Sequence, residues 1–369
     1  MFKLNNHLVS RLIGANLKRF FAEALTQLIN YSIILLFGLL VGAMVIWFSG
    51  KDPLAAYGAL WKGAFGNWAK FADTLDRSTV LIFSGLAAAV AFRTSVFNLG
   101  LEGQLYIGTF AAAWVGFTFH DLPRVVHIPL CMLAGVIAGG IWTLPVSYLR
   151  LQWNVPVMVP TLMLNYIGIL FTQYLVAFPF RDPTATMAGT PVLEASARLP
   201  KLMKGSVLNI GFIFALVMLF VVYWFMFKTK TGYEMRMVGY NPSFAAAVGM
   251  PVKRSAFLAM LISGGLVGLG GACVVMGFFG RFMSSFSVGY GWDGMMISLL
   301  AQNHPLGVFP ASLFYAALAN GALTMQSQTG VPQTVVGMVK GAIMFFVTIQ
   351  LFVAFFRGRM RKWILTSTG

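Results

Sequence analysis

Five polar side chains stand within or beside apolar stretches of the sequence, where they could hydrogen-bond to a solute. They are Asn98, Glu102, Gln104, Asn165 and Asn303. Carboxamide groups can pair with the hydroxyl groups and ring nitrogens of an uncharged solute, and they carry no charge that a membrane would penalise. We therefore predict that these five residues line a substrate pathway. The same amides could instead join helices, and Glu102 could instead stabilise a helix N-terminus, so both interpretations stay open.

Other kinds of chemistry have no residues to support them. The only Gly–Lys pair, Gly50–Lys51, runs into Asp52–Pro53, so the chain holds no phosphate-binding P-loop. The four histidines and the two cysteines, Cys131 and Cys273, show no spacing typical of a metal site or a disulfide framework. We predict no catalytic residue, no metal site and no cofactor in this chain, which is therefore not expected to be an enzyme.

The composition places these residues in a membrane. Of 369 residues, 58% are hydrophobic and only 10% are charged, whereas a soluble domain is about 45–50% apolar and about 25% charged. A water-soluble enzyme of this composition would lack the polar residues needed to cover its surface. The sequence therefore predicts an all-α polytopic membrane protein.

About ten transmembrane helices can be drawn along the chain, and three of them are too short for a straight crossing. Short, glycine-interrupted spans are typical of broken helices that line a transport pathway. The short ones are the second, third and eighth of the following series: Leu28–Phe48, Thr79–Phe92, Gln104–Phe119, Ile128–Leu149, Val155–Phe178, Val207–Phe227, Ala256–Phe279, Asp293–Gln302, Leu306–Leu323 and Val335–Phe356.

Positive charge orients this arrangement. Lysines and arginines gather in a basic N-terminal segment (1–27), in the loop 228–255 and in a basic tail (357–369), which places both termini and that loop in the cytoplasm. The membrane domain then spans 28–356, and 179–206 forms an outer loop. Asp73 and Asp76 are assigned to another outer loop, 49–78. Only Glu102 and Asp293 are left to approach the hydrocarbon region.

Glycines recur four residues apart in several spans, which places both members of a pair on one helix face and predicts close helix packing. The pairs are Gly38/Gly42, Gly135/Gly139, Gly264/Gly268 and Gly337/Gly341. The stretch that begins at Phe97 can also be aligned weakly with the one that begins at Phe286. This alignment indicates two related halves, as in many transporters.

The loop 228–255 contains a short predicted helix. Asn241 followed by Pro242 is a favourable helix start, Ala245 and Ala246 favour continuation, and Gly249 is placed to end the helix. A small-residue helix between basic flanks is suited to a groove on another protein, although a plain amphipathic connector is the alternative.

Three stretches, in order, give the chain a specific resemblance. Gly239-x-Asn241-x3-Ala245-Ala246-x2-Gly249 resembles the coupling-helix signature of the permease subunits of ABC importers for ribose, other simple sugars, nucleosides and branched-chain amino acids. The stretch F-N-L-G-L-E-G-Q over residues 97–104 resembles the sugar and nucleoside branch, and the stretch from Gly294 to Gly307 resembles a third motif of this family.

The resemblance implies partners and a localisation. A separate ABC ATPase, which holds ATP and Mg, would dock on Arg236, Gly239, Asn241, Ala245, Ala246 and Gly249. A second permease chain, identical or homologous, would complete the pore in the plasma membrane, and an extracytoplasmic substrate-binding lipoprotein would engage the outer loops. No nucleic acid partner is implied. The basic N-terminus and the Glu-Gly-Gln form favour nucleosides as the substrate.

Three alternatives stay open. The same machinery could import ribose or another simple sugar. An ion-coupled secondary transporter would explain the broken helices, but it would need more ionisable groups at the membrane centre than Glu102, Asp293 and Lys340 provide. A channel or an assembly factor would leave the ordered cytoplasmic loop unexplained.

Overall fold

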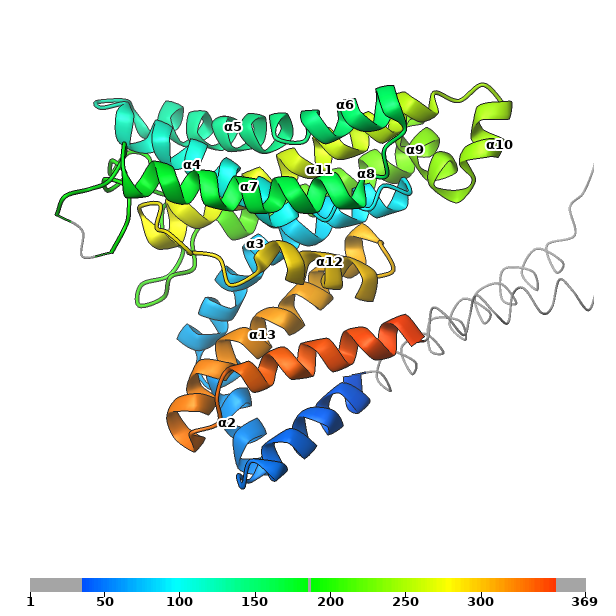
Figure 1. Cartoon of the computed structure of the whole chain (residues 1–369). Helices are drawn as coiled ribbons and strands as arrows, with labels where there is room; N and C mark the ends of the chain where they lie inside the picture. Colours follow the sequence, from blue (N-terminus) through cyan, green and yellow to red (C-terminus); the bar gives the residue numbers. More distant parts are fainter. Residues whose placement is uncertain (1–34, 185–186, 350–369) are drawn as a thin grey trace, which may run out of the picture. The chain divides into compact units, whose positions relative to one another are not determined.

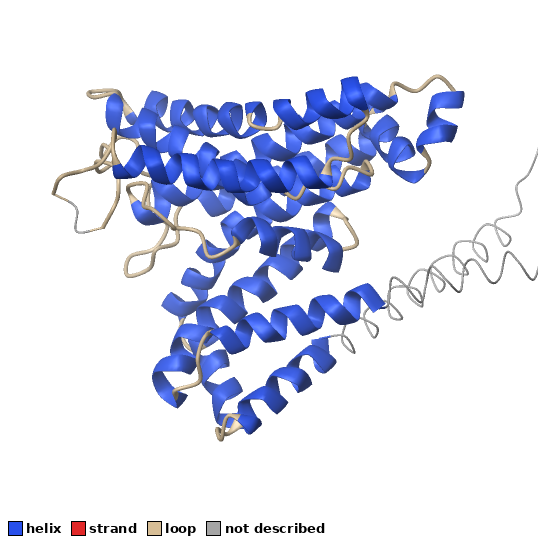
Figure 2. Ribbon diagram, viewed as in Figure 1, coloured by secondary structure: helices blue, strands red, loops and turns tan. Residues whose placement is uncertain are grey.

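The computed structural model describes residues 35–184 and 187–349, which form helices and loops without a β-strand in those ranges (Figures 1 and 2). The chain divides into two units. Unit 1 comprises Met1–Tyr57 and Met325–Gly369, and unit 2 comprises Gly58–Thr324. The predicted termini, 1–27 and 357–369, lie outside the described residues.

The labelled helices have the following bounds: α2 Pro53–Phe65, α3 Trp68–Arg93, α4 Leu101–Thr118, α5 Arg124–Ile141, α6 Leu144–Trp153, α7 Met158–Ala177, α8 Gly211–Lys228, α9 Lys230–Tyr240, α10 Pro242–Ala247, α11 Val252–Val274, α12 Tyr290–Leu300 and α13 Pro305–Thr329. A single π-helical turn, Val275–Phe279, extends α11. Unit 1 contains the described helical segments Leu35–Phe48 and Thr334–Ile349.

Helix α3 is the centre of unit 2. Its residues from Ser78 to Phe92 are all buried, as expected for a helix that is apolar around its whole circumference. It packs against α8, α11 and α12. The predicted span Thr79–Phe92 was too short, because the helix begins at Trp68, where the Asn67 side chain caps it by accepting from Lys70 N at 2.8 Å. Asp73 and Asp76 therefore lie on a helix, and their assignment to an outer loop was wrong.

Glycine pairs bring three helices of unit 2 into backbone contact. Gly268 of α11 lies against Gly108 of α4 and against Gly135 and Gly139 of α5, so closely that a Cβ at Gly268 would overlap the Gly135 carbonyl oxygen. This contact confirms the packing role predicted for the pairs in α5 and α11.

In unit 1, Gly38 and Gly42 meet Ile343 and Val339, so the packing role predicted for this pair is also confirmed. For Gly337 and Gly341, no atom of the described residues lies within 4 Å of the position that a Cβ would occupy. The packing role of this last pair therefore stays a prediction.

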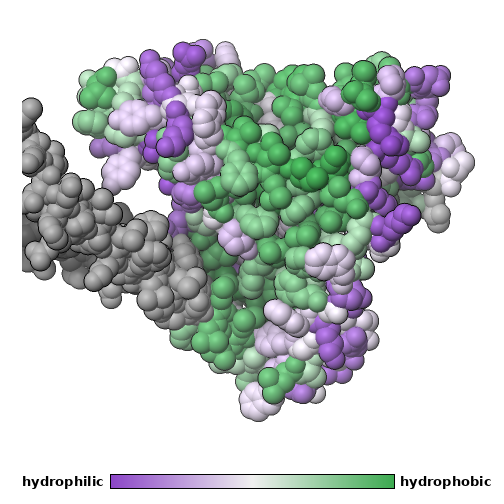
Figure 3. Space-filling view, turned by 180° about the vertical axis from the view of Figure 1, so that it is seen from behind, coloured by the Kyte–Doolittle hydropathy of each residue, from purple (hydrophilic) through white to green (hydrophobic). Residues whose placement is uncertain are grey.

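Among the described residues, six helices are long and apolar enough to cross a membrane. They are Trp68–Arg93, Arg124–Trp153, Met158–Ala177, Gly211–Lys228, Val252–Phe279 and Pro305–Thr329. Figure 3 shows a wide hydrophobic surface with polar residues gathered at its margins, the arrangement expected where lipid surrounds a helical bundle. The count of about ten spans and the cytoplasmic placement of both termini stay predictions.

Two pairs of helices in unit 2 pack reciprocally. Gly294 of α12 lies against Ser84 of α3, and Gly108 of α4 lies against Gly268 of α11. Helices α12 and α4 thus each pack on the long helix that precedes the other one in the chain. This exchange is consistent with the two related halves inferred from the Phe97 and Phe286 stretches.

Candidate functional site

Helices α4 and α12 begin next to each other inside unit 2, and Glu102 joins them. Glu102 lies in the first turn of α4 and is 4% exposed. Its Oε2 accepts a hydrogen bond from the backbone N of Gly291, the second residue of α12, at 2.5 Å. Helix N-termini carry free N–H groups and a partial positive charge, so one carboxylate stabilises both helix starts. The capping role considered for Glu102 is therefore present, but it acts mainly on the other helix.

Asn98 and Gln104 form a reciprocal amide pair just before and inside α4. Each amide donates to the other at 3.1 Å, and Asn98 Nδ2 also donates to Ser263 Oγ of α11 at 3.1 Å. Asn98 Oδ1 accepts from Gly100 N at 3.0 Å, which fixes the loop that leads into the helix. These side chains are 0% and 2% exposed, so the pair is a buried tie between α4 and α11.

Asn165 reaches the same region from α7. Its Oδ1 accepts a hydrogen bond from Gly103 N, and it is 1% exposed. Gly103 lies so close to the Asn165 backbone that a Cβ would come within 2.8 Å of the Asn165 Cα. The structure thus buries four predicted pathway residues around the start of α4, where three separate sets of hydrogen bonds tie this helix to α7, α11 and α12. Their contact with substrate stays a prediction.

Asn303 lies apart from that network. It follows α12 in a left-handed conformation with φ 57°, and its Oδ1 accepts from Ser298 Oγ at 2.8 Å. It lines a different cavity, together with residues of α3 and α9. The sequence could not distinguish the two locations, because all five residues follow glycine-rich or apolar stretches.

A polar cavity near the start of α3 was missed by the sequence reasoning. It has a volume of about 190 Å³, and its polar lining consists of Asp73, Asp76, Arg77, Tyr290 and Asn320. Asp76 Oδ1 accepts from Asn209 Nδ2 at 2.6 Å, and Asp73 Oδ1 accepts from Ser206 Oγ at 3.0 Å. The available signal was the three-residue spacing of the two acids, which places them on one helix face once Trp68–Ser78 is taken as helical.

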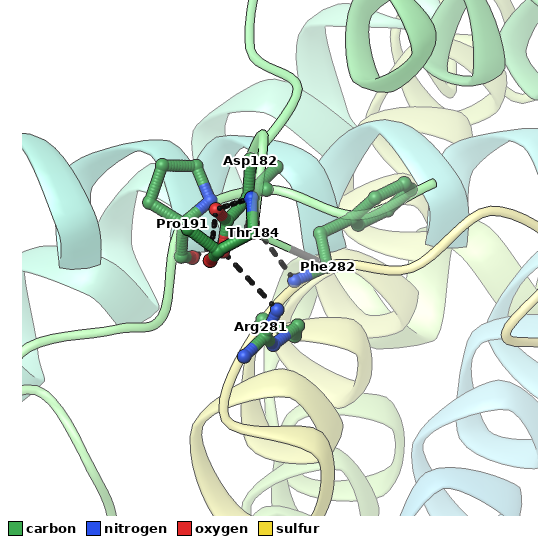
Figure 4. Close-up of polar contacts among 6 residues, drawn as sticks. Asp182, Thr184, Pro191, Arg281 and Phe282 are labelled. Carbon is green, nitrogen blue, oxygen red and sulfur yellow. Dashed lines mark hydrogen bonds and ion pairs between the residues drawn. The ribbon is translucent and has the colours of Figure 1, made fainter. Parts of the chain in front are cut away.

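The loop 179–206 is tied to the segment after α11 (Figure 4), while its predicted location outside the membrane stays a prediction. Asp182 accepts from Thr184 N at 2.9 Å and from Thr184 Oγ1 at 2.6 Å, and it pairs with Arg281 at 3.3 Å. Thr190 Oγ1 accepts from Phe282 N at 3.1 Å. The two hydrogen bonds from Thr184, together with the charge of Arg281, hold the pKa of Asp182 below its usual range. The loop is therefore an ordered surface where its residues are described.

The segment between α8 and α11 forms two helices. Thr229 caps α9, and Gly239 near its end lies against the Arg93 carbonyl so closely that no side chain fits there. Asn241 Oδ1 accepts from Phe244 N at 3.0 Å and caps α10, while Gly249 follows with φ 78°. The predicted short helix and both of its ends are confirmed. The sequence missed α9.

Helix α10 presents most of its surface outward. Ala245 is fully buried, whereas Ala246 is exposed and Phe244 is 51% exposed. A partner would therefore contact Phe244 and Ala246. The small side chain of Ala245 is buried and lets α10 pack closely against its neighbours. Arg236 of α9 does not point to this surface, because its guanidinium lies 4.7 Å from the centre of the Phe227 ring.

Comparisons with known proteins agree on one class. Residues 71–348 match the family model described as branched-chain amino acid transport system / permease component. The chain is 35% identical to the guanosine ABC transporter permease protein NupP of Bacillus subtilis, over 92% of this chain and 98% of that protein.

Two further relatives cover most of the chain. The nucleoside ABC transporter permease protein NupB of Lactococcus lactis is 32% identical over 87% of this chain and 90% of its own length. The glucose ABC transporter permease protein TsgB13 of Haloferax volcanii is 30% identical over 85% of each chain.

Proposed function

Since the chain belongs to the family described as branched-chain amino acid transport system / permease component, we propose that it is the membrane-spanning subunit of an ATP-driven importer for nucleosides. The chain is a multi-pass protein of the plasma membrane, with six candidate spans. It is a transport component, as its relatives are. ATP and Mg bind a separate ATPase in this proposal, a second permease chain completes the pore, and an extracytoplasmic binding lipoprotein delivers the substrate.

The observation that carries the substrate class is the similarity to permeases named for guanosine and nucleosides, which extends over nearly the whole chain. A simple sugar is the second candidate, because one relative of 30% identity is a glucose permease. A nucleoside contains a sugar, ribose, so a nucleoside and a simple sugar differ as substrates mainly in the nucleobase.

Two sets of polar residues serve the pathway in this proposal. Asp73, Asp76 and Asn320 line an existing cavity and offer acceptors to the N–H and O–H groups of a nucleoside. Asn98, Glu102, Gln104 and Asn165 are occupied by hydrogen bonds within the chain, so they meet substrate only if the junction of α4 and α12 opens. Asn303 would act near the cytoplasmic exit.

The coupling proposal is supported by the capped, outward-facing α10. Arg236, Gly239, Asn241, Ala245 and Gly249 shape and hold this segment, and Ala246 contributes to its exposed face. A helix with small residues can approach an ATPase groove closely, so closure of the ATPase can be transmitted to α9 and α11.

The test compares ATPase retention between two alanine-to-glutamate variants. We expect Ala246→Glu to lose the ATPase during co-purification from native membranes and to lose ATP-dependent uptake of labelled guanosine. The matched control, Ala195→Glu, changes an exposed alanine of the outer loop and should retain the ATPase. Uptake driven by an ion gradient in the purified permease alone would contradict the importer proposal. Uptake of glucose in preference to guanosine would reassign only the substrate.

A further inference from the structure

Two arginines from distant parts of the sequence meet at the end of unit 2 that carries α9 and α10. Arg93 ends α3 and Arg236 lies on α9, and both guanidinium carbons are 4.7 Å from the centre of the Phe227 ring. The aromatic ring attracts each cation through its π-face and so keeps two like charges close together. The ring of His304 lies 5.2 Å from the same Phe227 ring.

Within residues 35–184 and 187–349, no acidic side chain pairs with these arginines. Arg93 Nη1 and Arg236 Nε are both buried and have no hydrogen-bond partner in the part of the chain that the structure describes. Glu234, the acid of α9, lies 4.0 Å from Lys230 instead. Burial, and then the positive charge of Arg93, lower the pKa of His304, so this ring stays neutral at physiological pH and adds no third charge. A buried guanidinium nitrogen without an acceptor on each of two partly exposed arginines indicates that an anionic partner is missing.

A cavity of about 370 Å³ adjoins the two arginines. Its lining contains two cations, one amide and no acid: Phe92, Arg93, Arg236, Met237, Gly239, Tyr240 and Asn303. The Oδ1 of Asn303 already accepts from Ser298, so the donor end of this amide is the part that an incoming acceptor would use. The cavity therefore offers hydrogen-bond donors from three separate segments of the chain.

We propose that this cavity binds an oxyanion of the phosphate class on the cytoplasmic side of the protein. A tetrahedral dianion matches the two positive charges, and its several oxygens can accept from both guanidinium groups and from the Asn303 amide at once. A single carboxylate has two oxygens and one charge, so it would satisfy one arginine and leave the other uncompensated. The recessed position of the arginine nitrogens also favours a small ion over a side chain from another protein.

Occupancy of this cavity has a structural consequence. Gly239 and Tyr240 line it and lie immediately before Asn241, the residue that caps α10. An oxyanion that bridges Arg93 and Arg236 would join α3 to α9 and fix the base of the segment proposed to receive the ATPase. The cavity thus links the level of a cytoplasmic phosphate compound to the coupling segment, whichever solute the permease carries.

The first experiment measures binding to the full-length chain in nanodiscs of zwitterionic lipid. Inorganic phosphate is titrated at constant ionic strength against chloride, and the thermal midpoint and the heat of binding are recorded. We expect a saturable rise of the midpoint that weakens at least about tenfold in Arg93→Gln and in Arg236→Gln. Arg236→Lys should also weaken it, because lysine keeps the charge but loses the planar fork. Arg254→Gln, which removes an exposed charge near the start of α11, should leave the binding unchanged.

Three arms identify the source of the phosphate group. A nucleotide is identified if guanosine monophosphate binds more tightly than inorganic phosphate and if guanosine gives no response that depends on Arg93 and Arg236. Anionic phospholipid in the nanodisc that abolishes the response to added phosphate identifies a lipid headgroup. Equal affinity for the nucleotide and for inorganic phosphate identifies the free ion.

The proposal is overturned if no phosphate compound gives a saturable response, or if the Arg93→Gln/Arg236→Gln double variant responds as the unchanged chain does. Loss of the ATPase from both single variants without any phosphate response would instead assign the arginines to an acidic side chain of that subunit. Guanosine uptake is scored separately, so a failure of this site and a failure of the importer proposal are distinguishable.

Discussion

The junction of α4 and α12 and the arginine cavity are both polar places where helices end, yet they differ in how their hydrogen bonds are satisfied. At the junction, Glu102 accepts from Gly291, and Asn98 and Gln104 pair with each other. In the cavity, Arg93 and Arg236 each keep a buried nitrogen without an acceptor. Satisfied buried groups stabilise one arrangement of the helices, whereas unsatisfied groups favour whatever ligand completes them. The junction is therefore expected to stabilise the fold, and the cavity is expected to bind a ligand.

The strongest test of the junction removes the helix contact that supports it. Gly268→Leu places a side chain where α11 meets the backbones of α4 and α5, and neither backbone can move aside. We expect a loss of at least about 3 kcal/mol in the free energy of unfolding, or no folded protein at all. Size-exclusion chromatography of the detergent-solubilised chain measures the folded fraction.

Gly341→Leu is the matched control, because a Cβ there meets no atom of the described residues within 4 Å. It should leave the folded fraction unchanged. Equal loss in both variants would mean that leucine harms insertion in general and that the contact at Gly268 is not decisive.

The next largest effect is expected at Glu102. Glu102→Ala leaves the Gly291 N–H buried without an acceptor and removes the charge that faces two helix N-termini, which costs about 1–3 kcal/mol. Thermal unfolding of the purified chain measures this loss. Glu194→Ala is the control, since Glu194 is an exposed carboxylate paired with His120, and its removal should cost less than about 1 kcal/mol. A stability loss no larger at Glu102 than at Glu194 would break the comparison.

The parts of this molecule that sequence could predict are those set by neighbouring residues. Asn241, Pro242 and Gly249 specify the ends of α10 within nine residues, and the structure has both ends as predicted. Helix capping is a local interaction, so an isolated stretch of sequence contains all that it needs.

Other parts depend on residues far apart in the chain. Asp73 and Asp76 are tolerated on α3 because Ser206 and Asn209 donate to them, and 133 residues separate each of these pairs. Without these partners in view, two acids beside Lys70 and Arg77 are typical of a loop. The arginine cavity was missed for the same reason, since Arg93 and Arg236 belong to different helices and meet only at the Phe227 ring.

In contrast to Glu102→Ala, which should destabilise the chain, neutralising an arginine of the cavity should leave its stability nearly unchanged. Arg236→Gln removes a cation that repels Arg93 and also loses one contact with the Phe227 ring. These effects have opposite signs, so in phosphate-free buffer the free energy of unfolding should change by less than about 1 kcal/mol. Thermal unfolding in chloride measures it. A loss of unfolding free energy as large as that of Glu102→Ala would show that the arginine pair stabilises the fold without a ligand. The two regions would then not differ in the way proposed.

The smallest effect is expected at Asp182, whose hydrogen bonds are satisfied as they are at the junction but lie in the loop 179–206. The folded-state pKa of Asp182 is depressed, first by the Thr184 hydrogen bonds and then by Arg281, so its contribution to stability is complete above its unfolded pKa of about 3.9. The contribution disappears as the pH falls through the lower folded-state pKa. Asp182→Asn should therefore lower the thermal midpoint slightly at pH 7, and the difference from the unchanged chain should shrink below about pH 4.

Thr184→Val separates the causes of this pH dependence. It removes the side-chain hydrogen bond that contributes most to the low pKa, while Arg281 and the backbone donor stay in place. The pH at which the stability contribution is lost should then move upward toward about 4. An unchanged transition in this variant would assign the low pKa to the groups that stay in place, the Thr184 backbone donor and Arg281. A difference between Asp182→Asn and the unchanged chain that persists at all pH values would mean that packing, and not ionisation, sets the stability of this loop.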